Sequence, residues 1–166
     1  MSRYLTFSNH LISLFGGMTI SDERDRECYV AKGRFSLISK RWKLYRADAG
    51  NTELVTIRKK KLAIRPTYIV SGTAGEMWFR RKLLSFKRQF WVEKGPYGGA
   101  WVRGANILDL SFTVEYQGKT LASASEKLFS LRDKHVIQVH ADDEQTELFV
   151  VICMLILQLD KRHQND

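Results

Sequence analysis

A short apolar–small–apolar triplet recurs six times along this chain of 166 residues, and residues that alternate between apolar and polar follow each copy. The triplets are Ile12-Ser13-Leu14, Phe35-Ser36-Leu37, Leu62-Ala63-Ile64, Leu84-Ser85-Phe86, Leu108-Asp109-Leu110 and Phe129-Ser130-Leu131. The alternating pairs are Met18/Ile20, Trp42/Leu44, Thr67/Ile69 or Tyr68/Val70, Phe90/Val92, Phe112/Val114 and Ile137/Val139. Alternation at a period of two predicts half-buried antiparallel strands.

Turn-forming residues separate one unit from the next. They lie at Ser21-Asp22, Asp48-Ala49-Gly50-Asn51, Ser71-Gly72, Gly95-Pro96 and Gln117-Gly118. We interpret each unit as a two-stranded hairpin. Six hairpins predict about twelve strands over residues 4–140. An open sheet of that size would leave two unpaired edges, so we expect an antiparallel barrel that closes on itself.

The C-terminal segment predicts one helix, at about residues 143–161. From Leu148 to Leu159, eleven of twelve residues are apolar, and Asp142 with Gln145 resembles a capping box at the start. A helix that is apolar on all sides must be surrounded by protein or lipid. A membrane span needs about 20 apolar residues. We therefore expect no transmembrane span, but a single domain, 1–166, whose mainly β barrel surrounds this helix.

The hairpin units and the terminal apolar helix resemble the LURP-one-related family, in particular its bacterial YxjI-like members. Three segments carry the resemblance best: Val30 to Asp48 (VAKGRFSLISKRWKLYRAD), Lys61 to Tyr68 (KLAIRPTY) and Lys127 to Leu131 (KLFSL). The resemblance implies the tubby C-terminal-like fold, a twelve-stranded barrel threaded by a hydrophobic helix. Tubby proteins and phospholipid scramblases share that fold.

The resemblance implies less about function than about fold, although proteins that share the fold act at lipid surfaces. Tubby domains bind phosphoinositide headgroups, and scramblases act at membranes. No headgroup-binding motif of tubby can be matched to this chain residue by residue, so the resemblance transfers no site. The calcium-binding and cysteine-rich segments of scramblases are also missing.

Positive charge is concentrated in the middle of the chain. The net charge is +9, but the segment from Lys32 to Lys94 holds 17 Lys and Arg against 4 Asp and Glu. Its basic runs supply the candidate ligand-binding residues, which are Arg58, Lys59, Lys60, Lys61, Arg80, Arg81, Lys82, Lys87 and Arg88. Basic side chains of this density predict binding to anionic phospholipid or phosphoinositide-like headgroups, or to another polyanion. The alternative is a protein-interaction scaffold whose charge serves solubility.

Nucleic acid is a less favoured polyanion. Trp78, Phe79, Phe90 and Trp91 lie among the basic residues and could stack on bases. However, Phe90 alternates with Val92 in a strand pattern that must serve the core. The chain also has no RNP motif, helix-turn-helix or zinc-ligand spacing.

No motif points to an enzyme, a cofactor or a metal site. The four histidines form no HExxH pattern, and Cys28 and Cys153 have no paired spacing. We expect no deep polar pocket in which titratable groups converge. The start of the chain lacks the apolar stretch of a signal peptide. We therefore expect a cytoplasmic protein, located peripherally at the inner face of the membrane when it binds lipid.

Overall fold

Twelve strands and one helix are formed by the residues that the computed structural model describes, which are 2–10, 17–35, 40–48, 50–85, 88–104, 112–124 and 134–164. The first six strands are β1 (Arg3–His10), β2 (Gly17–Ser21), β3 (Glu27–Phe35), β4 (Lys40–Arg46), β5 (Glu53–Lys59) and β6 (Thr67–Gly72). The other elements are β7 (Met77–Arg81), β8 (Gln89–Lys94), β9 (Trp101–Gly104), β10 (Phe112–Tyr116), β11 (Lys119–Ala124), β12 (Lys134–Val139) and α1 (Glu144–Gln164).

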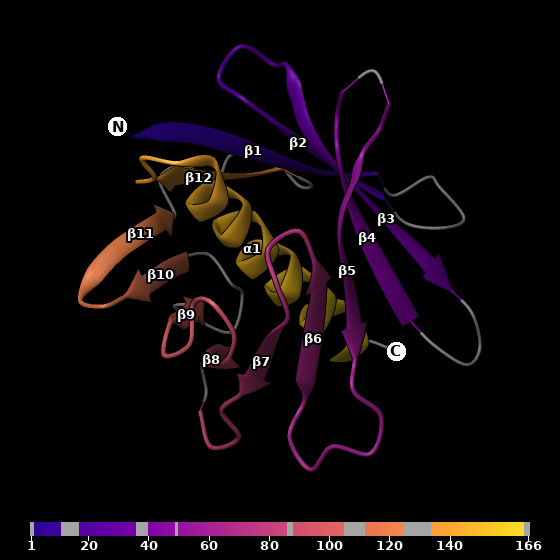
Figure 1. The fold of residues 1–166 in the computed structure, drawn as a ribbon, viewed down its shortest axis with the longest axis vertical. Helices are drawn as coiled ribbons and strands as arrows, with labels where there is room; N and C mark the ends of the chain where they lie inside the picture. Colours follow the sequence, from indigo (N-terminus) through magenta and orange to yellow (C-terminus); the bar gives the residue numbers. More distant parts are fainter. Residues whose placement is uncertain are drawn as a thin grey trace.

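The strands form a closed antiparallel barrel, as the sequence predicted. Each strand pairs with its neighbours in the chain, and β1 closes the ring by pairing with β12 from Arg3↔Val139 to Ser8↔Lys134. Figure 1 shows α1 running through the middle of this ring of strands. Closure removes the exposed strand edges that an open sheet would present.

Buried and more exposed residues alternate on strands such as β8, β9 and β10, as predicted, whereas β6 buries four consecutive residues from Thr67 to Val70. The predicted residues are buried on the described strands, for example Met18 and Ile20 on β2, and Phe90 and Val92 on β8. The other strand of each hairpin supplies a second buried set, which includes Leu5 and Phe7 on β1. The triplet from Leu62 to Ile64 is not part of a strand, however, because it lies in the connection between β5 and β6.

The helix fills the interior of the barrel. Every residue from Leu148 to Asp160 is buried. Phe149 stacks on Tyr97, with ring centroids 3.9 Å apart, and on Phe79 at 6.1 Å. The helix begins at Glu144, and its cap is Asp143 in place of the predicted Asp142–Gln145 pair. Asp143 accepts hydrogen bonds from the backbone N–H (2.8 Å) and the hydroxyl (2.7 Å) of Thr146.

The direction of α1 gives the barrel two chemically different ends. We call the end at which the helix begins the entry end. It carries the turns that lead from even-numbered to odd-numbered strands, such as the turn at residues 22–26. The connections from β5 to β6 and from β7 to β8 lie at the opposite end, where Asp160 of α1 meets Arg81 of β7. Among the described residues, no helix has both the length and the apolar character of a membrane span.

Candidate functional site

Four of the nine predicted basic residues carry exposed charges at the end opposite to the helix start. Arg58, Lys60, Lys61 and Lys82 are exposed, and Lys59 is half-buried on the strand face that it shares with the buried Ile57. Lys61 and Lys82 form no ion pair with any residue that the structure describes. Lys87 lies outside the described residues. The structure thus brings the basic runs of β5 and β7 to the same end of neighbouring hairpins.

Arg81 and Arg88 face the interior, where they hold the helix. An Nη of Arg81 lies 3.1 Å from Oδ2 of Asp160, and Nε of Arg88 lies 3.7 Å from the same oxygen. The Asp160 side chain is only 2% exposed. Arg80 points outward, but its guanidinium pairs with Glu93 at 2.7 Å. These three arginines therefore have partners inside the protein, unlike Lys61 and Lys82.

Two further arginines belong to this surface and were missed by the sequence reasoning. Arg41 of β4 is exposed and lies directly opposite Arg58 of β5 in the strand register. Arg65, in the β5–β6 connection, is exposed as well. Like charges that face each other across a strand pair are destabilising. We call the exposed set Arg41, Arg58, Lys60, Lys61, Arg65 and Lys82 the basic end. Only the pairing of β4 with β5 reveals the contribution of Arg41.

Half-buried tryptophans lie next to the basic end on the outer face of the barrel. Lys60 Nζ lies 4.6 Å from the ring centroid of Trp78, and Arg65 Cζ lies 5.7 Å from that of Trp91. Trp91 also lies 6.0 Å from Trp101, centroid to centroid. Phe79 and Phe90, the other two aromatic candidates for base stacking, are fully buried in the core. The outer surface therefore combines cations with indole rings.

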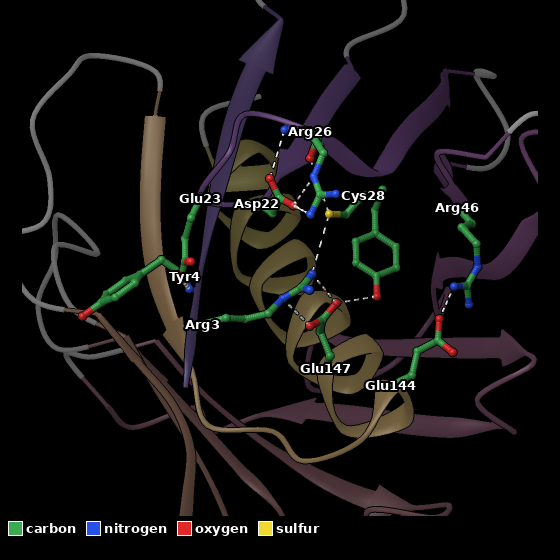
Figure 2. A network of polar contacts seen from close by, with 10 residues as sticks. Arg3, Tyr4, Asp22, Glu23, Arg26, Cys28, Arg46, Glu144 and Glu147 are labelled. Carbon is green, nitrogen blue, oxygen red and sulfur yellow. Dashed lines mark hydrogen bonds and ion pairs between the residues drawn. The ribbon is translucent and has the colours of Figure 1, made fainter. Parts of the chain in front are cut away.

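An open cleft of about 620 Å³ lies at the entry end. Its lining includes Arg3, Cys28, Tyr29, Arg46, Glu144 and Glu147. Figure 2 shows Glu147 and Glu144, from the first turns of α1, meeting arginines of the barrel strands. Titratable groups converge here because barrel closure brings strand residues to the helix start, although they are far apart in the chain. The cleft is open to solvent, however, and is not the deep polar pocket that the prediction excluded.

Glu147 is the centre of this cleft. It accepts a hydrogen bond from Arg3 (2.9 Å) and another from the Tyr29 hydroxyl (2.8 Å), and a second Arg3 nitrogen lies 2.7 Å from its other oxygen. Arg46 pairs with Glu144. Burial, followed by the negative charge of Glu147, raises the pKa of Tyr29. Arg3 and Arg46 pair with Glu147 and Glu144 and so join the helix to the barrel, but Asp142 and Asp143 also line the cleft. The excess charge of this lining is negative, which does not suit an anionic ligand.

The two cysteines are poor nucleophiles. Burial raises the pKa of the Cys28 thiol at the cleft and that of Cys153 inside the barrel. The described part of the chain holds no group of three or more His, Cys, Asp or Glu side chains that could bind a metal ion. Cys28 could accept only a weak hydrogen bond from Arg3, at 3.6 Å from the sulfur. The basic end is therefore the surface with the clearest capacity to bind a ligand.

Comparison with known proteins identifies the family. A family model described as LURP-one-related matches residues 4–157. Searches of curated proteins and of solved structures each found no match. The family match covers all twelve strands from Tyr4 onward and α1 as far as Leu157. On this ground the chain belongs to the LURP-one-related family.

Proposed function

We propose that the protein binds anionic phospholipid headgroups through its basic end. The observation that carries this proposal is the direct opposition of two exposed arginines, Arg41 and Arg58, on neighbouring strands. Such an arrangement costs stability in the free protein. An anionic ligand placed between the guanidiniums removes that repulsion, and Arg forms two parallel hydrogen bonds with a phosphate group.

The distribution of the remaining charge supports a membrane surface as the source of the phosphate groups. Lys61 and Lys82 come from two successive hairpins and extend the positive surface beyond Arg41 and Arg58. A basic residue close to an anionic bilayer contributes about 1 kcal/mol to binding. A surface that carries several of them acts on many headgroups at once. We further propose that the protein is a YxjI-like member of the family and that its fold is tubby-like and related to that of scramblases. We propose that it acts as a single domain at the inner face of the membrane and is not an enzyme.

Nucleic acid is the second candidate, because Trp78 and Trp91 lie on the outer face among the cations. The cations of Lys60 and Arg65 already lie over these two rings. A base would have to displace them before it could stack. This favours lipid headgroups over bases as the ligand.

Co-sedimentation with vesicles tests the proposal. We expect the protein to bind phosphatidylglycerol vesicles and not phosphatidylcholine vesicles, with binding that weakens as salt is added. The variant Lys61→Ser/Lys82→Ser should bind about 30-fold more weakly, because two contributions of about 1 kcal/mol are lost. A change of Arg81 or Arg88 is unsuitable here, because either would disturb the contact with Asp160.

The matched control is Arg24→Ser/Lys119→Ser. It removes two exposed charges from the entry end, in the β2–β3 turn and at the start of β11. Its net charge equals that of the test variant, and its binding should stay close to that of the unchanged protein. Equal losses in both variants would show that net charge alone drives binding. Equal binding to neutral and anionic vesicles would refute headgroup recognition.

A further inference from the structure

Four large apolar side chains project from the connections at the basic end. The exposed fractions are 105% for Leu62, 94% for Ile64, 98% for Leu84 and 49% for Leu83. The fifth exposed large hydrophobic residue in the described chain is Tyr4, which is 39% exposed on β1 at the other end. Single exposed apolar residues are ordinary, but a group in neighbouring loops marks an interaction surface.

The two loops that carry these side chains are neighbours, and hydrogen bonds join the two ends of each loop. We call residues 60–66 and 82–85 the tip loops. The Lys60 N–H donates to the Thr67 carbonyl (2.8 Å), and the Lys82 N–H donates to the Gln89 carbonyl (2.8 Å). The Arg81 N–H donates to the Pro66 carbonyl at 2.9 Å and so links one loop to the other. The ends of both loops are therefore held by the barrel while their apolar residues point into solvent.

Leu62 adopts a backbone conformation that does not suit leucine. Its φ angle is +56°, in the left-handed region that Gly and Asn occupy most easily. The side chain is fully exposed, so packing within the protein does not compensate for this strain. Strain of this kind at an exposed apolar residue points to a contact outside the folded chain.

Cations surround the apolar tips. Lys60, Lys61 and Arg65 belong to the first tip loop, and Lys82 begins the second. Trp91 lies behind them, opposite Arg80 in the strand register and half-buried on the outer face. Aliphatic side chains at the tips with cations around them match the hydrocarbon layer and the phosphate layer of an anionic bilayer. A nucleic acid has no apolar phase to receive leucine and isoleucine side chains.

We propose that the tip loops insert Leu62, Ile64 and Leu84 into the hydrocarbon layer of an anionic membrane, while Lys60, Lys61, Arg65 and Lys82 contact the phosphates above it. This inference rests on the proposed headgroup binding and adds depth to it: the protein is anchored by apolar insertion as well as by charge. Binding should therefore persist in part at salt concentrations that screen the surface charges.

The variant Leu62→Asn/Leu84→Ser tests insertion without disturbing the core. Asn tolerates the left-handed conformation, so the thermal midpoint should be unchanged or higher. Binding to phosphatidylglycerol vesicles should fall about a hundredfold, because two aliphatic side chains no longer leave water. The residual binding should disappear completely at high salt. Tyr4→Ser removes an exposed apolar side chain from the other end and should bind as the unchanged protein does.

A fluorophore gives a second readout that does not depend on affinity. In a Cys28→Ser background, Leu84→Cys labelled with a polarity-sensitive dye should shift to the blue on phosphatidylglycerol vesicles. The same label on Lys119→Cys, at the entry end, should not shift. Cys153 is fully buried and should stay unlabelled. If the double variant does not fold, the fluorophore result alone decides.

The outcomes separate the two proposals. Salt-sensitive vesicle binding with no blue shift, and no loss in Leu62→Asn/Leu84→Ser, would overturn insertion and leave headgroup binding intact. A blue shift on phosphatidylcholine vesicles equal to that on phosphatidylglycerol would leave insertion intact and overturn headgroup binding. Strong retention of an RNA homopolymer, with no shift on either vesicle, would overturn both.

Discussion

Asp160, near the end of the central helix, lies 3.1 Å from the guanidinium of Arg81 on β7. Its other carboxylate oxygen accepts a hydrogen bond from the Tyr68 hydroxyl of β6 at 3.2 Å. Burial, and then the charge of Asp160, raises the pKa of Tyr68. Through these contacts the helix end is tied to β6, which follows the first tip loop, and to β7, which precedes the second. The position of those loops therefore depends on a buried carboxylate.

Asp160→Asn should destabilise the fold by about 3 kcal/mol, because removing one partner leaves buried charge without compensation. Asn keeps the shape of the side chain, so lost charge and not lost volume is the cause. Urea denaturation measures the change. Glu93→Gln is the control, since its pair with Arg80 is solvent-exposed and should be worth at most about 1 kcal/mol. Similar losses in the two variants would contradict a special role for the helix contact.

Met154→Asp should abolish folding. Met154 is 3% exposed on the part of α1 that the barrel surrounds. A carboxylate there would be desolvated among apolar residues, which costs more than a single domain can normally tolerate. Circular dichroism and gel filtration would show an unfolded or aggregated chain, whereas Met154→Leu should lose less than about 1.5 kcal/mol. A folded Met154→Asp would mean that the helix can leave the barrel.

Lowering the pH should weaken the β2–β3 turn over a defined pH range. The hydrogen bond from the Arg26 side chain, supported by backbone N–H groups, lowers the pKa of Asp22 from 3.8 to about 2. Because the pKa is lower in the folded state, the stabilisation is present above pH 3.8 and is lost as the pH falls towards 2. The difference in thermal midpoint between the unchanged protein and Asp22→Asn should therefore shrink over this range.

The control for that titration is Asp25→Asn in the same turn. Within the described residues the Asp25 side chain makes no ion pair. Its midpoint difference from the unchanged protein should not follow the titration of Asp22. A direct NMR measurement of the Asp22 carboxyl pKa near its ordinary value would contradict the prediction.

The local pattern of the sequence was enough to predict much of the barrel. Period-two alternation at Met18/Ile20 and Phe90/Val92 identified inward-facing strand residues, because a strand buried on one face must alternate. The nearly continuous apolar run on α1 could be buried only if the strands surround the helix. The same periodicity misplaced one triplet. Leu62 and Ile64 have the spacing of a strand, but they are exposed in a connection.

The function of the basic residues could be predicted only in part. Charge density pointed to the hairpins that form the basic end, but not to which of their side chains are exposed and which pair inside the protein. Arg80 and Arg81 are adjacent in the chain, yet one pairs with Glu93 on the outer face and the other with Asp160 inside. Arg41 was overlooked, because its relation to Arg58 exists only once β4 and β5 are in register.

The sequence by itself determined the alternation of strands, the closed sheet and the apolar helix within it, because these follow from local periodicity and from the need to bury apolar surface. Only the tertiary structure decided which charged and apolar side chains meet at each end of the barrel. It paired Glu147 with Arg3 and Asp160 with Arg81, across more than 70 positions of chain in each case, and it left Leu62 exposed. Such pairings depend on the closure and register of the barrel, which no short segment encodes.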